Sequence, residues 1–72
     1  MRKYFLLFEV EVIENSDGKS CGTFSKERTI DCAPAHLDSC VASTQREMQR
    51  FADAQSLPGF YATVTLKQVL PL

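Results

Sequence analysis

The residues best suited to chemistry lie in one stretch, Cys32, His36 and Cys40, spaced four residues apart. Thiolate and imidazole are the ligands that zinc prefers, and residues four apart share one flank of a helix. These three residues are therefore candidate metal ligands, with Cys21 as a fourth. Against this, Pro34 disfavours regular helix around Cys32. Cys40 also has a simpler interpretation as a small apolar residue beside the core. The sequence favours this second interpretation, without a metal or other cofactor.

Other chemistry finds less support. A redox pair, Cys21–Cys32 or Cys32–Cys40, is less favoured still, because no lysine cluster that would lower a thiol pKa lies nearby. Three cysteines cannot form a complete disulfide framework within one chain, so we expect reduced thiols and a cytoplasmic protein. Glu9 and Glu11 share one strand face, where paired carboxylates are far more often solvated than catalytic. We predict that the chain is not an enzyme.

One amphipathic helix, predicted over 35–56, would position the cysteine stretch. Its apolar stripe has helical spacing, and Pro58 with Gly59 ends it. Gln49 falls on the side predicted to face solvent. The stripe consists of Leu37, Val41, Thr44, Met48, Phe51 and Gln55.

Three strands complete the chain, and their alternating apolar residues are typical of half-buried strands. The segment 3–14 is the most apolar and should be central. The segment 19–31 is polar and contains Gly22, which indicates an edge strand. The third strand is predicted over 60–70, with Leu70 on the same face as Val64.

The turn between the first two strands is predicted to be a type I turn followed by a bulge glycine, Gly18. In that register Asn15 pairs with Lys19 and Val10 faces Phe24, which matches apolar residues across the strands. The predicted fold is thus a single α+β domain over 1–72, with element order β-β-α-β. The three-stranded sheet has the order 2-1-3, its neighbouring strands are antiparallel, and the helix covers the even-numbered face.

One helix cannot cover both faces of the sheet. We expect Phe5, Leu7 and Tyr61 to lie close together on the uncovered face as a recognition patch or dimer interface. Exposed sheet edges offer another route, in which a partner adds a strand. The predicted partner-binding residues are Phe5, Leu7, Ile13, Tyr61 and Val69.

Charge and composition argue against two classes of partner. Eight basic and nine acidic residues give a formal net charge of −1, so no strong field favours nucleic acid or an anionic membrane. Glu9 and Glu11 would also repel phosphate from the uncovered face. The apolar run after Arg2 and Lys3 is too short for a secretory signal, and we expect no targeting segment.

The leading hypothesis is therefore a small non-enzymatic protein–protein interaction module. It would be a homodimer or a binding or inhibitory accessory protein, acting through the uncovered sheet face or an edge strand. The alternatives are a metal- or thiol-dependent protein that uses Cys32, His36 and Cys40, and a nucleic-acid-binding accessory protein. The small size and lack of catalytic apparatus resemble accessory proteins of phages and mobile elements.

Overall fold

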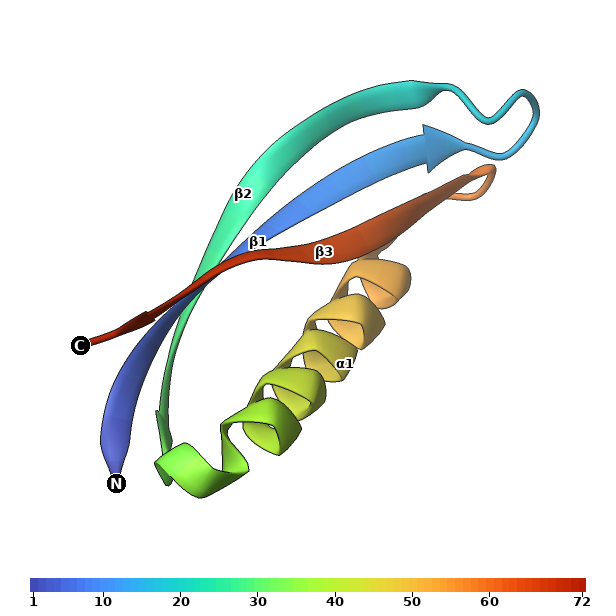
Figure 1. Cartoon of the computed structure of the whole chain (residues 1–72). Helices are drawn as coiled ribbons and strands as arrows, with labels where there is room; N and C mark the ends of the chain where they lie inside the picture. The colour runs from blue at the N-terminus through green and yellow to red at the C-terminus, as the bar shows by residue number, and fades with distance from the viewer.

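The computed structural model describes every residue from Met1 to Leu72 and contains one three-stranded sheet and one α-helix (Figure 1). The strand order is β2-β1-β3, and both outer strands run antiparallel to β1. The predicted α+β fold and strand order are therefore confirmed. In chain order, the elements are β1 (Arg2–Glu14), β2 (Ser20–Cys32), a 3₁₀ turn (Pro34–His36), α1 (Leu37–Gln55) and β3 (Phe60–Pro71).

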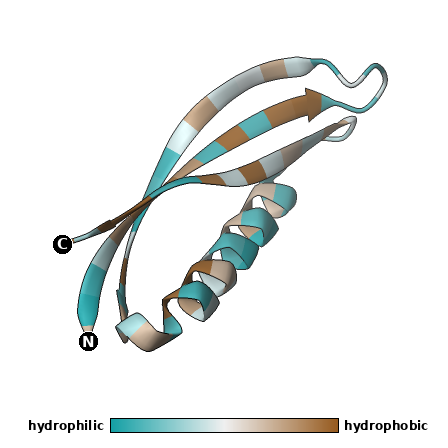
Figure 2. Cartoon of the chain, viewed as in Figure 1, coloured by the Kyte–Doolittle hydropathy of each residue, from teal (hydrophilic) through white to brown (hydrophobic).

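The core lies between the even-numbered face of β1 and the helix. Alternation along β1 is visible as bands of opposite hydropathy (Figure 2). Successive side chains of a strand point to opposite faces, so the even residues of β1 share the covered face. The rest of the core comes from the end of β2, from α1 and from β3. The buried residues are Tyr4, Leu6, Phe8, Val10, Cys32, Met48, Ala62 and Val64.

Pairing of β1 with β2 follows the predicted register over most of its length. Val10 lies opposite Phe24, as the apolar match required. The register shifts by one at a bulge after Gly22, and Glu14 rather than Asn15 donates its N–H to the carbonyl of Lys19. The prediction was therefore wrong at the turn itself, because one residue of β2 is left unpaired there.

A second bulge, between β1 and β3, changes which residues of β3 face the helix. Phe8 lies opposite Leu66 whereas Leu7 lies opposite Gln68, so Lys67 has no partner in β1. Beyond this bulge the alternation reverses. Val69 packs against the core and Leu70 lies beside Phe5 on the uncovered face. Both residues were predicted on the opposite faces, because strict alternation does not anticipate an inserted residue.

The helix runs obliquely under the sheet. Its N-terminal end lies near the end of β2 and its C-terminal end near the start of β3 (Figure 1). Pro34 opens a 3₁₀ turn, so regular α-helix begins at Leu37, two residues later than predicted. Gly59, with φ +88°, turns the chain into β3. The helix α1 packs mainly on β3 and touches β2 little.

The molecule is elongated, with extents of 44 × 17 × 15 Å and a radius of gyration of 13.8 Å. A compact domain of this length has a radius of gyration of about 11 Å. Its accessible surface is 4989 Å², whereas a compact monomer of this mass exposes about 4,500 Å². The chain therefore leaves about 500 Å² more surface in water than a compact monomer of this size.

Candidate functional site: an open strand edge and its groove

The cysteine stretch forms a covalent link. Cys32, at the end of β2, and Cys40, in the first turns of α1, are joined by a disulfide. Cys32 is buried, 2% exposed, and Cys21 is an exposed free thiol. In this structure the expectation of reduced thiols is therefore wrong for Cys32 and Cys40, and Cys21 remains a thiol. From the sequence, Cys32–Cys40 was considered only as a redox pair and set aside, because the pattern of residues did not indicate that the turn at Pro34 folds α1 back onto β2.

This link removes the candidate metal ligands. Disulfide sulfurs are not thiolates, so the candidates Cys32 and Cys40 cannot act as zinc ligands in this state. His36 is exposed and belongs to the 3₁₀ turn. No group of three or more His, Cys, Asp or Glu side chains in the chain is arranged to hold a metal ion.

The predicted patch on the uncovered face is divided in two. Phe5 lies opposite Leu70, whereas Tyr61 lies opposite Ile13 at the other end of β1. Eight positions along a strand separate Phe5 from Ile13, or about 27 Å. The expectation that Phe5, Leu7 and Tyr61 lie together was therefore wrong, because the antiparallel register brings the start of β3 to the end of β1.

Polar residues fill the space between these two apolar ends. Glu9 lies between them, and its carboxylate is 3.9 Å from the ammonium group of Lys67. Phe5, Leu7 and Ile13 are half-buried, and Tyr61 is 43% exposed. The uncovered face therefore offers two small apolar areas rather than one continuous patch.

The outer edge of β3 is covered at Ala62 and Val64 by two glutamines of α1. The Gln49 amide donates to the Ala62 carbonyl at 2.7 Å, and its oxygen accepts from the Val64 N–H at 3.1 Å. The Gln45 amide donates to the Val64 carbonyl at 3.1 Å. The Val64 N–H points away from β1, because its single hydrogen is donated to Gln49. Side chains of α1 thus occupy hydrogen-bonding positions that an added strand would need.

The outer edge of β2 carries no such cover. In β1 the Glu14 N–H donates to Lys19, next to β2, whereas the Asn15 N–H donates to Gly59, next to β3. The backbone groups of the even residues of β1 therefore bond to β2. Because Val10 pairs with Phe24, the backbone groups of the even residues of β2 bond to β1. The odd residues of β2 point their N–H and C=O groups outward. This outer row, which we call the β2 edge, consists of the backbone groups of Thr23, Ser25, Glu27 and Thr29.

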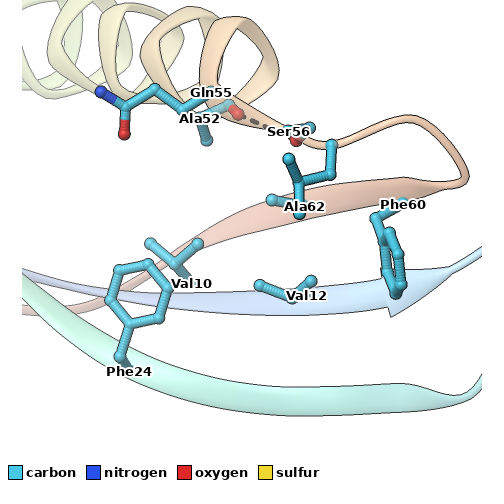
Figure 3. Close-up of a pocket in the computed structure, with 9 residues that line it drawn as sticks. Val10, Val12, Phe24, Ala52, Gln55, Ser56, Phe60 and Ala62 are labelled. Atoms are coloured by element: carbon cyan, nitrogen blue, oxygen red, sulfur yellow. Dashed lines mark hydrogen bonds between the residues drawn. The ribbon is translucent and has the colours of Figure 1, made fainter.

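A groove lies beside the β2 edge, on the face that α1 only partly covers (Figure 3). It consists of two adjoining hollows of about 330 and 370 Å³, which share Val10, Phe24, Ala52 and Gln55. The first is almost entirely apolar, and the second has a charged rim on β2. The remaining lining residues of this α1/β2 groove are Val12, Lys26, Glu27, Arg28, Met48, Phe51, Ser56, Leu57, Phe60 and Ala62.

Two aromatic side chains of the groove remain about half exposed to water. Phe24 is 48% exposed and Phe51 is 56% exposed. Phe51 was predicted in the apolar stripe that packs on the sheet, but α1 is rotated so that Gln45 and Gln49 reach β3. The Lys26 ammonium lies 5.8 Å from the Phe24 ring centre, a cation–π distance.

One polar contact joins α1 to β2 at the lining of the groove. The Arg28 guanidinium donates through Nε to the Met48 sulfur at 3.3 Å. The disulfide and this contact hold α1 to the C-terminal half of β2. Toward the other end of β2 α1 lies along β3 instead, and this divergence opens the groove.

Sequence reasoning missed both the open groove and the covered β3 edge. The signal for the second was present, since Gln45 and Gln49 are four residues apart and lie on one side of a helix. An amide that both donates and accepts is suited to bind exposed strand backbone. The pattern alone could not say which edge the glutamines would meet.

No helix of the chain is long and apolar enough to span a membrane. No protein-family model matches the sequence, and no match was found among curated proteins or solved structures.

Proposed function

We propose that this chain is a small non-enzymatic protein–protein interaction module that binds through the β2 edge and the α1/β2 groove. The observation that carries the proposal is the difference between the two sheet edges. Gln49 and Gln45 cover the edge of β3, whereas the backbone groups of the β2 edge have no partner in the chain. An edge strand with open hydrogen-bonding groups can accept a further strand.

The surface beside the β2 edge supports the same proposal. Large apolar side chains that stay exposed together are typical of interaction sites. Phe24 and Phe51 each expose about half of a ring that offers roughly 200 Å². The surplus of accessible surface over that of a compact monomer also fits a chain that is completed by a partner.

The uncovered face has a smaller part in this proposal. Phe5, Leu7, Ile13 and Tyr61 remain candidate contacts, whereas Val69 is withdrawn because it packs against the core. The partner is a second copy or another protein, as for a binding or inhibitory accessory protein. The net charge of −1 gives nucleic acid little attraction.

A cytoplasmic location is part of the proposal and sets a condition on the cysteines. Disulfides are rare in the reducing cytosol, so Cys32 and Cys40 would be thiols there. Acid quenching of cells followed by denaturing alkylation counts the thiols. Three alkylated cysteines fit a reducing compartment, whereas alkylation of Cys21 alone contradicts it.

The variant Ser25→Pro tests the role of the β2 edge. Its N–H points outward, so proline removes no bond of the sheet, and edge positions of this kind tolerate proline. We expect the variant to fold like the parent by circular dichroism and to lose association in light scattering and pull-down. Ser25→Ala is the matched control, since it keeps the N–H and should associate normally.

The double variant F5S/Y61S tests the uncovered face in the same assays. Association that survives Ser25→Pro but is lost in F5S/Y61S would move the site to that face. A parent chain that stays monomeric at high concentration and retains no partner in pull-down would contradict the proposed function itself.

A further inference from the structure

We propose that the occupant of the β2 edge is a second copy of this chain, paired antiparallel to β2 about a two-fold axis at Ser25. This inference rests on the proposed function and names its partner. The two sheets would then join into one, with both helices on the same side. The pairing is specific enough to be tested residue by residue.

Charge complementarity selects the position of the axis. Residues that lie directly opposite in an antiparallel pair share a face and interact, and like charges there are destabilising. An axis at Lys26 sets that lysine against its own copy. An axis at Glu27 sets two glutamates together and Lys26 against the partner's Arg28. An axis at Ser25 creates no like-charge pair between Gly22 and Arg28.

The same register also creates favourable contacts. Lys26 lies opposite the partner's Phe24, which adds a second ring to the one that it already approaches at 5.8 Å. Glu27 lies opposite the partner's Thr23, and Arg28 opposite the partner's Gly22. An axis at Phe24 also avoids like-charge pairs. However, it places Glu27 opposite the partner's Cys21, which lies in the bulge of β2 where regular pairing is interrupted.

Backbone geometry fits this register. Thr23, Ser25 and Glu27 all direct their N–H and C=O groups outward. With the axis at Ser25, each of these residues meets another that also points outward. The three pairs are therefore of the hydrogen-bonded kind, in which both N–H groups find a carbonyl. The β2 edge thus gains a ladder of inter-strand hydrogen bonds without any change in the pairing of β2 with β1.

The groove adds apolar surface to the strand pairing. Phe24 stands on the covered face, next to the axis, so the two α1/β2 grooves become continuous across the joined sheets. Phe51 borders that shared groove from α1. Specific dimers bury about 800 Å² on each partner, an area that a bare strand edge does not supply alone. A net charge of −1 opposes the meeting of two copies only weakly.

Cysteine cross-linking tests the register directly. In a Cys21→Ser background, Ser25→Cys, Thr23→Cys and Glu27→Cys are treated with a short thiol-to-thiol cross-linker. Opposed residues in such a pair lie about 5.5 Å apart between Cα atoms, whereas Thr23 and its own copy would lie about 14 Å apart. We expect Ser25→Cys to give cross-linked dimers without being mixed with a second variant. Thr23→Cys and Glu27→Cys should do so only when mixed with each other.

Each outcome decides between the inference and the function on which it rests. Cross-linking of Ser25→Cys and of the mixed pair, at least tenfold above the unmixed variants, supports the dimer. A light-scattering dimer without this pattern overturns the register. A monomer whose binding to another protein is lost in Ser25→Pro overturns the second copy and leaves the interaction module standing. A monomer with no partner at all overturns both.

Discussion

The side-chain oxygen of Gln49 accepts a hydrogen bond from the backbone N–H of Val64 at 3.1 Å. The same amide donates to the Ala62 carbonyl at 2.7 Å. One helical side chain thus takes the place of a neighbouring strand along this part of β3. The two edges of the sheet therefore differ, because α1 occupies backbone groups of Ala62 and Val64 in β3, whereas no side chain bonds to the outward row of β2.

Loss of this glutamine should destabilise the fold and uncover a second edge. Gln49→Ala leaves the Val64 N–H and the Ala62 carbonyl without their partner, which costs about 1–2 kcal/mol. Urea unfolding measures this loss. Gln55→Ala is the control on the same helix, because the side chain of Gln55 makes no hydrogen bond. Equal stabilities for the two variants would contradict a role of Gln49 at the edge. We also expect Gln49→Ala to aggregate at lower concentration than the parent.

The disulfide should contribute stability by closing a short loop. Cys32 and Cys40 are eight positions apart, and closing a loop of this size stabilises by about 2–3 kcal/mol in the chain-entropy description. Dithiothreitol should therefore lower the urea midpoint of unfolding for the parent and for Cys21→Ser. Cys40→Ser should have a lower urea midpoint than the parent even without dithiothreitol, and the reductant should not change it. A parent that unfolds identically in both conditions would contradict the link.

Two apolar residues of α1 should differ sharply in their effect on the monomer. Met48 is buried in the core and its sulfur contacts Arg28 of β2, so Met48→Ala should cost about 2–3 kcal/mol. Phe51 is 56% exposed, and Phe51→Ala should cost less than about 1 kcal/mol in dilute solution. Denaturant midpoints measured well below the association concentration separate the two. Comparable losses would place Phe51 in the core after all.

The fold could be predicted from the sequence because β1 alternates so regularly. Tyr4, Leu6, Phe8 and Val10 fix one face, and their match with Ile30 and Phe24 fixes the register of β2. These are local patterns of period two, and they survive in the structure.

What could not be predicted depends on contacts between distant segments. The bulge at Lys67 exchanges the faces of Val69 and Leu70, and no local pattern marks it. The rotation of α1 follows from the bonds of Gln45 and Gln49 to β3, and it leaves Phe51 outside. The pairing of Cys32 with Cys40 likewise depends on how the chain turns at Pro34. The candidate site residues were therefore expected on the uncovered face, with an open sheet edge as the other route, whereas the groove lies beside α1.

Amide hydrogen exchange by NMR decides whether the β2 edge is the binding site, since it reports on the backbone groups of this edge one by one. As the protein concentration rises, we expect the outward amides of Thr23, Ser25 and Glu27 to become protected. The inward amides of Phe24 and Lys26 should be protected at every concentration. Outward amides that exchange at the unprotected rate throughout, while the mass in solution shows association, would rule out binding through the β2 edge.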